Sequence, residues 1–114
     1  MTSDIIYLPQ SMYLKVKNKE ITRVIRPLSD RLKVRERDWV PIVFKGTEDN
    51  VMVEIDNISY TLFKDLTDKV ARKCGYADVK ELKHNLLEKY VTLDNGSRLY
   101  LYDFLVVAVS EKVE

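Results

Sequence analysis

The chain has 114 residues, of which 46% are hydrophobic and 32% are charged, and its formal net charge is +1. This composition is typical of one compact domain over residues 1–114 and excludes a disordered chain or a second sizeable core. No apolar run approaches the roughly 20 residues of a membrane helix, and a single cysteine and a single histidine exclude a disulfide framework and favour neither a metal site nor another cofactor.

The N-terminal sequence MTSDIIYLPQ has no basic segment before its apolar residues, so we expect an intracellular, cytoplasmic protein without a membrane anchor. Residues 5–7 predict a short strand that ends before Pro9. Ser11 is expected to cap a helix over residues 12–19 that buries Met12, Tyr13 and Val16.

The basic residues 22–26 predict the next strand, which ends at Pro27 because proline donates no ladder hydrogen bond. An irregular connection follows over residues 27–37, anchored by Leu28, Leu32 and Val34. Residues 39–44 then predict a strand, in which Pro41 favours an edge position or a bulge.

Residues 46–50 predict a turn, followed by a half-buried strand over residues 51–60 with alternating apolar residues, Tyr60 included. Apolar residues at helical spacing then predict a helix over 63–74 that ends at Gly75. A second helix begins at Asp78, with Glu81 as its capping-box partner. It is expected to bury Val79, Leu82, Leu86, Leu87 and Tyr90.

A turn at Asn95 and Gly96 leads into the last strand, over residues 98–109, which is apolar enough to cross the middle of a sheet. Within that strand Asp103 would be costly to bury without a partner, which an arginine of the basic strand could supply. About five strands with a helical pair before the last one indicate an α+β fold, for which a small barrel is the natural way to remove strand edges.

The residues after the first expected helix form a motif that resembles the ASCH superfamily of PUA-like β-barrels. In the family a Gly-x-Lys segment is followed by an arginine, and a Gly-Asp pair precedes the next strand. The matching residues here are Lys19, Ile21, Thr22 and Arg26, followed by Arg37 and Asp38 at the Gly-Asp positions. The order of elements from Tyr60 to Phe104 also resembles the family.

The resemblance implies a PUA-like barrel that handles RNA or modified nucleotides. Some members are amidohydrolases that act on N4-acetylcytidine with the motif's lysine and threonine and a glutamate from the helical region. Here Ile21 stands at the lysine position, and the glutamate region reads Arg72 to Gly75. Isoleucine offers neither a nucleophile nor a proton acceptor, so we name no catalytic residue and expect a protein without that activity.

Segment 15–37 contains nine Lys or Arg against three acidic residues, which gives it a net charge of +6. Such a block favours binding of a polyanion. We expect Arg26, Thr22 and Arg23 near the centre of a cleft between barrel and helices, with further cations on its rim and Tyr76 as an exposed ring. The rim residues are Lys17, Lys19, Lys33, Arg35 and Arg37.

The resulting hypothesis is a non-catalytic domain that binds RNA or a modified nucleotide. The sequence leaves open a nucleoside hydrolase or ribonuclease with a rearranged site. It equally leaves open a protein-interaction module whose basic surface meets an acidic partner, or a basic block that is only a solvated face.

Overall fold

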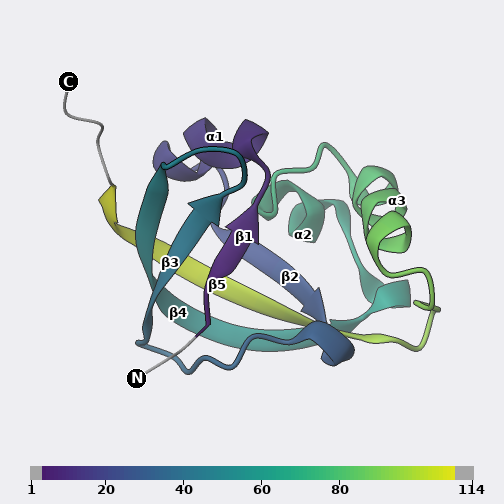
Figure 1. The fold of residues 1–114 in the computed structure, drawn as a ribbon. Coiled ribbons are helices and arrows are strands. Elements are labelled where there is room, and N and C mark those ends of the chain that lie inside the picture. The colour runs from purple at the N-terminus through teal and green to yellow at the C-terminus, as the bar shows by residue number, and fades with distance from the viewer. Residues whose placement is uncertain (1–3, 110–114) are drawn as a thin grey trace.

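A five-stranded sheet, curled into an open half-barrel, forms the body of the computed structural model, which describes residues 4–109 (Figure 1). The strands are β1 (Ile6–Leu8), β2 (Arg23–Pro27), β3 (Trp39–Phe44), β4 (Asn50–Leu62) and β5 (Arg98–Val109). Their order across the sheet is β1-β3-β4-β5-β2, with β1 and β3 parallel and the other pairs antiparallel. β1 and β2 are therefore the two edges of the half-barrel.

The concave face of the sheet encloses the larger of two hydrophobic cores, which we call the barrel core. All five strands contribute to it, because each presents apolar side chains at alternate positions. Its buried strand residues are Ile6, Leu8, Val24, Val40, Ile42, Phe44, Val51, Val53, Ile55, Tyr102 and Phe104.

A 3-10 turn, η1 (Gln10–Met12), and the short helix α1 (Tyr13–Lys17) cover the barrel core at the end drawn uppermost in Figure 1. Val16 is fully buried, and the Tyr13 ring meets Phe44 edge-on at 5.1 Å between centroids, as the predicted apolar side of this helix requires. The predicted cap is wrong, since Ser11 lies inside the 3-10 turn and the N-cap of α1 is Met12, without a side-chain hydrogen bond.

The helices α2 (Asp68–Lys73) and α3 (Val79–Lys89) pack on the opposite face of β2 and β5 and enclose a second core, the helix core (Figure 1). Its buried members are Ile25, Phe63, Leu66, Ala71, Cys74, Leu82, Leu86, Leu99 and Leu101. The α3 cap is confirmed, because the Asp78 side chain accepts a hydrogen bond from Glu81 N at 2.9 Å.

The single helix predicted over 63–74 is interrupted. Phe63–Asp65 form a 3-10 turn, η3, Leu66 is extended at φ −61° and ψ 140°, and α2 begins only after Thr67. The Thr67 hydroxyl caps that helix by accepting from Val70 N. A cap residue inside an apolar helical pattern thus starts a new helix. Gly75, at φ +95°, ends it as predicted.

Strand β5 runs between β4 and β2, and the two cores cover the opposite faces of its first half. Leu101 faces the helix core, and its neighbour Tyr102 faces the barrel core. The prediction of a central strand over residues 98–109 is confirmed, as is the α+β half-barrel with its helical pair before this strand.

Irregularities of the sheet fall where the sequence pattern breaks. The β4 register shifts between Ile55 and Asn57, which explains why the apolar alternation of this strand resumes at Ile58. Pro41 lies just beyond the β1 pairing, which begins at Ile42, so β3 is locally an edge at that point.

Three residues expected in the core are exposed instead, namely Leu28 at 52%, Tyr60 at 62% and Leu87 at 40%. Leu28 lies in the surface 3-10 turn η2 (Leu28–Asp30), and Leu87 is rotated about 100° from the buried Leu86 around the helix axis. Within residues 4–109, none of the helices is long and apolar enough to span a membrane.

Candidate nucleic-acid interface

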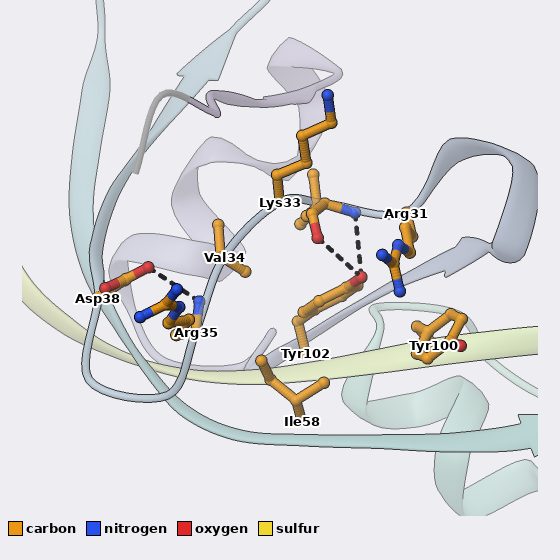
Figure 2. A pocket seen from close by; sticks show the side chains of 9 residues that line it. Arg31, Lys33, Val34, Arg35, Asp38, Ile58, Tyr100 and Tyr102 are labelled. Carbon is orange, nitrogen blue, oxygen red and sulfur yellow. Dashed lines mark hydrogen bonds between the residues drawn. The ribbon is translucent and has the colours of Figure 1, made fainter. Parts of the chain in front are cut away.

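A cleft of about 470 Å³ lies between segment 31–38 and the concave face of β4 and β5 (Figure 2). We call it the loop cleft. Its walls combine three cations, two tyrosines and a few apolar and acidic groups. The lining residues are Arg31, Leu32, Lys33, Val34, Arg35, Asp38, Ile58, Tyr100 and Tyr102.

Segment 31–38 has no regular secondary structure, yet side chains fix its course. The Tyr102 hydroxyl accepts a hydrogen bond from Leu32 N at 3.0 Å and donates one to Leu32 O at 3.4 Å. Leu32 and Val34 pack on the barrel core, as the sequence predicted. Asp38 accepts from Arg35 N at 2.8 Å, so the cationic side chains project from an ordered backbone.

The cations of the loop cleft all belong to segment 31–38 and are spread along it. Arg31, Lys33 and Arg35 are exposed, and Figure 2 shows Arg31 pointing toward the Tyr100 ring. A hydrogen bond to Arg98, and after it one to Arg31, lowers the pKa of the Tyr100 phenol. The cleft is therefore suited to an anionic ligand. Arg31 belongs to the basic block and Tyr100 to the last strand's alternation, but neither was singled out from the sequence.

Arg23, one of the expected central residues, is held by Asp103 on the neighbouring strand β5. Arg23 Nε lies 2.5 Å from Asp103 Oδ1 and Nη2 lies 3.1 Å from Oδ2, in a bidentate geometry. The side chains are 13% and 23% exposed, and the hydrogen bond to Asp103 is the main cause of the raised pKa of Arg23. The expected arginine partner for Asp103 is thus confirmed.

Arg26 joins the two edges of the half-barrel. Its Nη1 donates to Ile25 O at 2.9 Å and its Nη2 donates to Tyr7 O, on strand β1, at 3.4 Å. Tyr76 is half-buried and donates to Asn85 at 3.0 Å. The space among Arg23, Arg26 and Tyr76 measures only about 30 Å³, so little room remains between barrel and helices.

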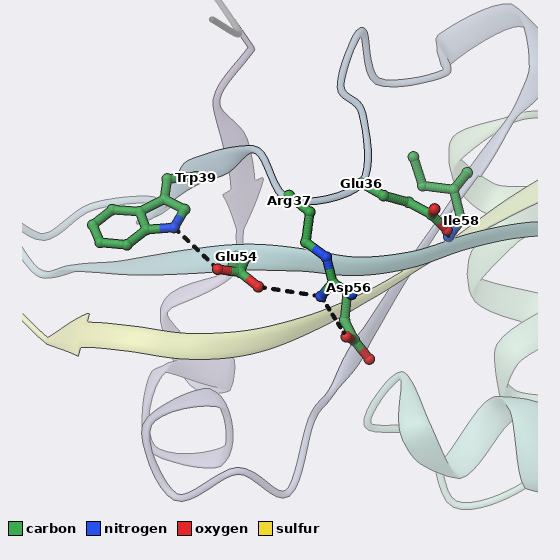
Figure 3. Close-up of polar contacts among 6 residues, drawn as sticks. All are labelled: Glu36, Arg37, Trp39, Glu54, Asp56 and Ile58. Atoms are coloured by element: carbon green, nitrogen blue, oxygen red, sulfur yellow. Dashed lines mark hydrogen bonds and ion pairs between the residues drawn. The ribbon is translucent and has the colours of Figure 1, made fainter.

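Arg37 lies among acidic groups on β4 (Figure 3). Its Nη1 is 3.5 Å from Glu54 Oε2 and 3.3 Å from Asp56 Oδ1, while Trp39 Nε1 donates to the other Glu54 oxygen at 3.2 Å. Glu36 accepts from Ile58 N nearby. The positive charge of Arg37 is therefore balanced locally.

The nine residues expected to bind RNA thus lie in several places. Arg23, Arg26 and Tyr76 line the narrow space beside β2, Lys33 and Arg35 line the loop cleft, and Arg37 lies with the acids of β4. Thr22 and Lys19 line a separate hollow together with Phe104, and Lys17 ends α1 with its ammonium 6.0 Å from the centroid of the Tyr13 ring.

The position of the family's lysine is filled by a core residue. Ile21 is 1% exposed and packs so closely on Gly75 that a Cβ there would lie 2.6 Å from Ile21 Cδ1. Burial raises the pKa of the adjacent Cys74 thiol to about 12, so this thiol is not ionised at neutral pH. Between residues 4 and 109 no group of three His, Cys, Asp or Glu side chains could hold a metal ion.

Two backbone angles add to the resemblance to the ASCH motif. Lys19 has φ 63° and Arg37 has φ 77°, and they are the only non-glycine residues with positive φ in the part of the chain that the structure describes. These are the two positions at which the family motif has glycine. The chain retains the backbone that glycine would favour, although the glycines themselves are absent.

No protein-family model matches the chain, and no curated protein matches it in sequence. Solved structures do match. The ASCH domain from Lactobacillus crispatus JV V101 aligns with a TM-score of 0.71 at 12% identity, over 90% of this chain and 77% of that one. Protein EF3133 from Enterococcus faecalis V583, described under the family model DUF984, aligns with a TM-score of 0.70 at 10% identity, over 100% of this chain and 86% of its own. The chain therefore has the fold of an ASCH domain.

Proposed function

We propose that this domain binds RNA, or a nucleotide derived from it, in the loop cleft and without catalysis. The observation that carries the proposal is the cleft itself, about 470 Å³ with three cations on one wall and the partly buried Tyr100 ring on its floor, beside the buried Tyr102. Cations neutralise phosphates and release counterions, and aromatic rings contact unstacked bases. The cytoplasmic, PUA-like domain expected from the sequence fits this role.

The proposed site differs from the one expected around Arg26. The space there is about 30 Å³, and Arg23 and Arg26 already bond to Asp103 and to backbone carbonyls. The loop cleft offers more room, and its cations are exposed. A hydrolase has less support, because Ile21 stands buried where the family has a lysine. Binding of an acidic protein partner is the outcome to distinguish by experiment.

The test is fluorescence-anisotropy binding of single-stranded RNA, hairpin RNA and matched DNA at low and moderate salt. The variant Arg31→Glu with Arg35→Glu is expected to weaken RNA binding at least about tenfold and to flatten its salt dependence. A matched control, Lys69→Glu with Lys80→Glu, makes the same charge change on exposed residues of α2 and α3 outside the cleft, and it should bind more tightly than the cleft variant.

Equal loss of affinity in both variants would refute a specific cleft and leave only general charge attraction. Absence of RNA binding by the wild-type protein at low salt would refute the function, and a stable complex with an acidic polypeptide would then support the interaction module. Reversing Arg23 is unsuitable as a test, because a glutamate beside Asp103 would destabilise the fold itself.

A further inference from the structure

An aromatic pair, the exposed Tyr60 and the partly buried Tyr100, continues the loop cleft along β4 and β5. Tyr60 on β4 lies directly opposite Tyr100 on β5, with ring centroids 6.3 Å apart and ring planes inclined by 53°. Tyr60 is 62% exposed, although it is on the same face of β4 as Ile58, which packs on the barrel core. The pair therefore presents aromatic surface to solvent at the rim of the concave face.

An arginine completes this surface. The Arg98 guanidinium carbon lies 4.9 Å from the centroid of the Tyr60 ring, within the range of a cation–π contact. The same side chain acts on Tyr100, where its hydrogen bond lowers the phenol pKa. Arg98 thus brings a positive charge and a flat guanidinium group to both rings, a combination that suits a base attached to a phosphate.

Strand geometry connects the pair to the cleft floor. Tyr100 and Tyr102 are two residues apart on β5, and Ile58 and Tyr60 are two residues apart on β4, so each pair points to one face of the sheet. Ile58, Tyr100 and Tyr102 all line the loop cleft. Tyr60 is the next residue of β4 on this face after Ile58, and it lies just outside the cleft.

We propose that Tyr60 and Arg98 form a stacking subsite for a second base of single-stranded RNA, next to a nucleotide held in the loop cleft. This inference rests on the proposed function and narrows it: the ligand is an unpaired strand of at least two nucleotides, since a base in a duplex would remain stacked on its neighbours. The surface accepts any base, because every base has an aromatic face.

The experiment compares Tyr60→Ala with Tyr60→Phe, and with Tyr7→Ala as a control at a similarly exposed tyrosine on strand β1. The probes are a short single-stranded RNA that contains one 2-aminopurine, whose fluorescence changes on stacking, and a mononucleotide. Tyr60→Ala should weaken RNA binding at least about fivefold and remove the fluorescence change. Tyr60→Phe and Tyr7→Ala should retain the RNA affinity and the fluorescence change. The affinity for the mononucleotide should fall in the Arg31→Glu, Arg35→Glu variant and not in Tyr60→Ala.

The inference fails if Tyr60→Ala binds the RNA like the wild type while the Arg31→Glu, Arg35→Glu variant does not; the function would then stand without the subsite. If the wild type binds neither probe at low salt, the function and the subsite fail together. An equal loss of affinity for fully paired duplex RNA and for single-stranded RNA in Tyr60→Ala would also overturn the subsite.

Discussion

The Arg23–Asp103 pair joins strands β2 and β5 beside the helix core. Both side chains are largely removed from water, so each charge depends on the other for its hydrogen bonds. A pair of this kind contributes to stability chiefly because each charged group supplies hydrogen bonds to the other, and either charge would be costly to bury alone. Its role is therefore to align the two strands, whatever ligand binds elsewhere.

Removing one member of this pair should cost more than removing both. Arg23→Met leaves the Asp103 carboxylate partly buried without its partner and is expected to lower the free energy of unfolding by about 2 kcal/mol. The double variant Arg23→Met with Asp103→Leu should recover part of that loss. Urea denaturation of the four proteins of the cycle measures the coupling, and additive losses would show that the two charges are not coupled.

At the scale of single elements, the turns at Lys19 and Arg37 are held in backbone conformations that glycine adopts more easily. The turn after α1 is fixed by a hydrogen bond from Lys19 N to Val16 O at 3.0 Å, and the turn before β3 by one from Arg37 N to Ile55 O at 2.7 Å. The surrounding bonds impose the conformation, so the side chain at these positions can vary.

Lys19→Gly is expected to stabilise the domain by about 0.5–1 kcal/mol, because the left-handed conformation strains any side chain. Thermal unfolding should show a higher midpoint. Lys17→Gly, placed within α1 where φ is helical, serves as the contrast and should be destabilising by about 1 kcal/mol. A lower midpoint for Lys19→Gly would mean that the turn stores no relievable strain.

Local sequence patterns predicted most elements, and their failures have local causes. The twelve residues of β5 follow from an unbroken β-prone run, and Gly75 and Asp78 mark helix ends by their own chemistry. The helix over 63–74 failed because apolar spacing does not reveal that Thr67 caps a new helix. Tyr60 was misplaced because alternation gives the face of a strand but not where the half-barrel opens.

At the scale of the whole molecule, two ionisable groups of the helix core, the buried Cys74 and the partly buried Tyr90, should make the free energy of unfolding fall at alkaline pH. Burial raises the pKa of Cys74 from 9.0 to about 12. Burial, followed by a hydrogen bond to Asp30, raises that of Tyr90 from 10.0 to about 12. The native protein keeps both protons in a range where the unfolded chain releases them, so the stabilisation is complete below about pH 9 and is lost as the pH rises toward 12.

Urea denaturation from about pH 8 to about pH 11 should therefore show a falling free energy of unfolding. In Cys74→Ala, which removes one of the two groups, the free energy of unfolding should fall less steeply over this range, relative to the variant's own value at about pH 8. Identical slopes in the two proteins would show that the thiol is not protected by folding.

The candidate site depended on long-range arrangement and was therefore less predictable than the elements. The charge block includes two of the residues that line the loop cleft, Lys33 and Arg35. The partners of Arg23, Arg26 and Arg37 lie on other strands, so the sequence could not show that these three charges are engaged within the fold. The Tyr60–Tyr100 contact likewise follows from a register set by the β4 bulge.

The strand order also determines when the sheet can be completed during synthesis. β1 and β2 leave the ribosome before β3, β4 and β5, yet they form the outer edges, and β2 pairs only with β5. Residues 23–27 therefore wait without a sheet partner until residues 98–109 have been made. While residues 28–97 are being made, this basic, β-prone segment has no strand partner, and the like charges of Arg23 and Arg26 disfavour its pairing with the same segment of another chain.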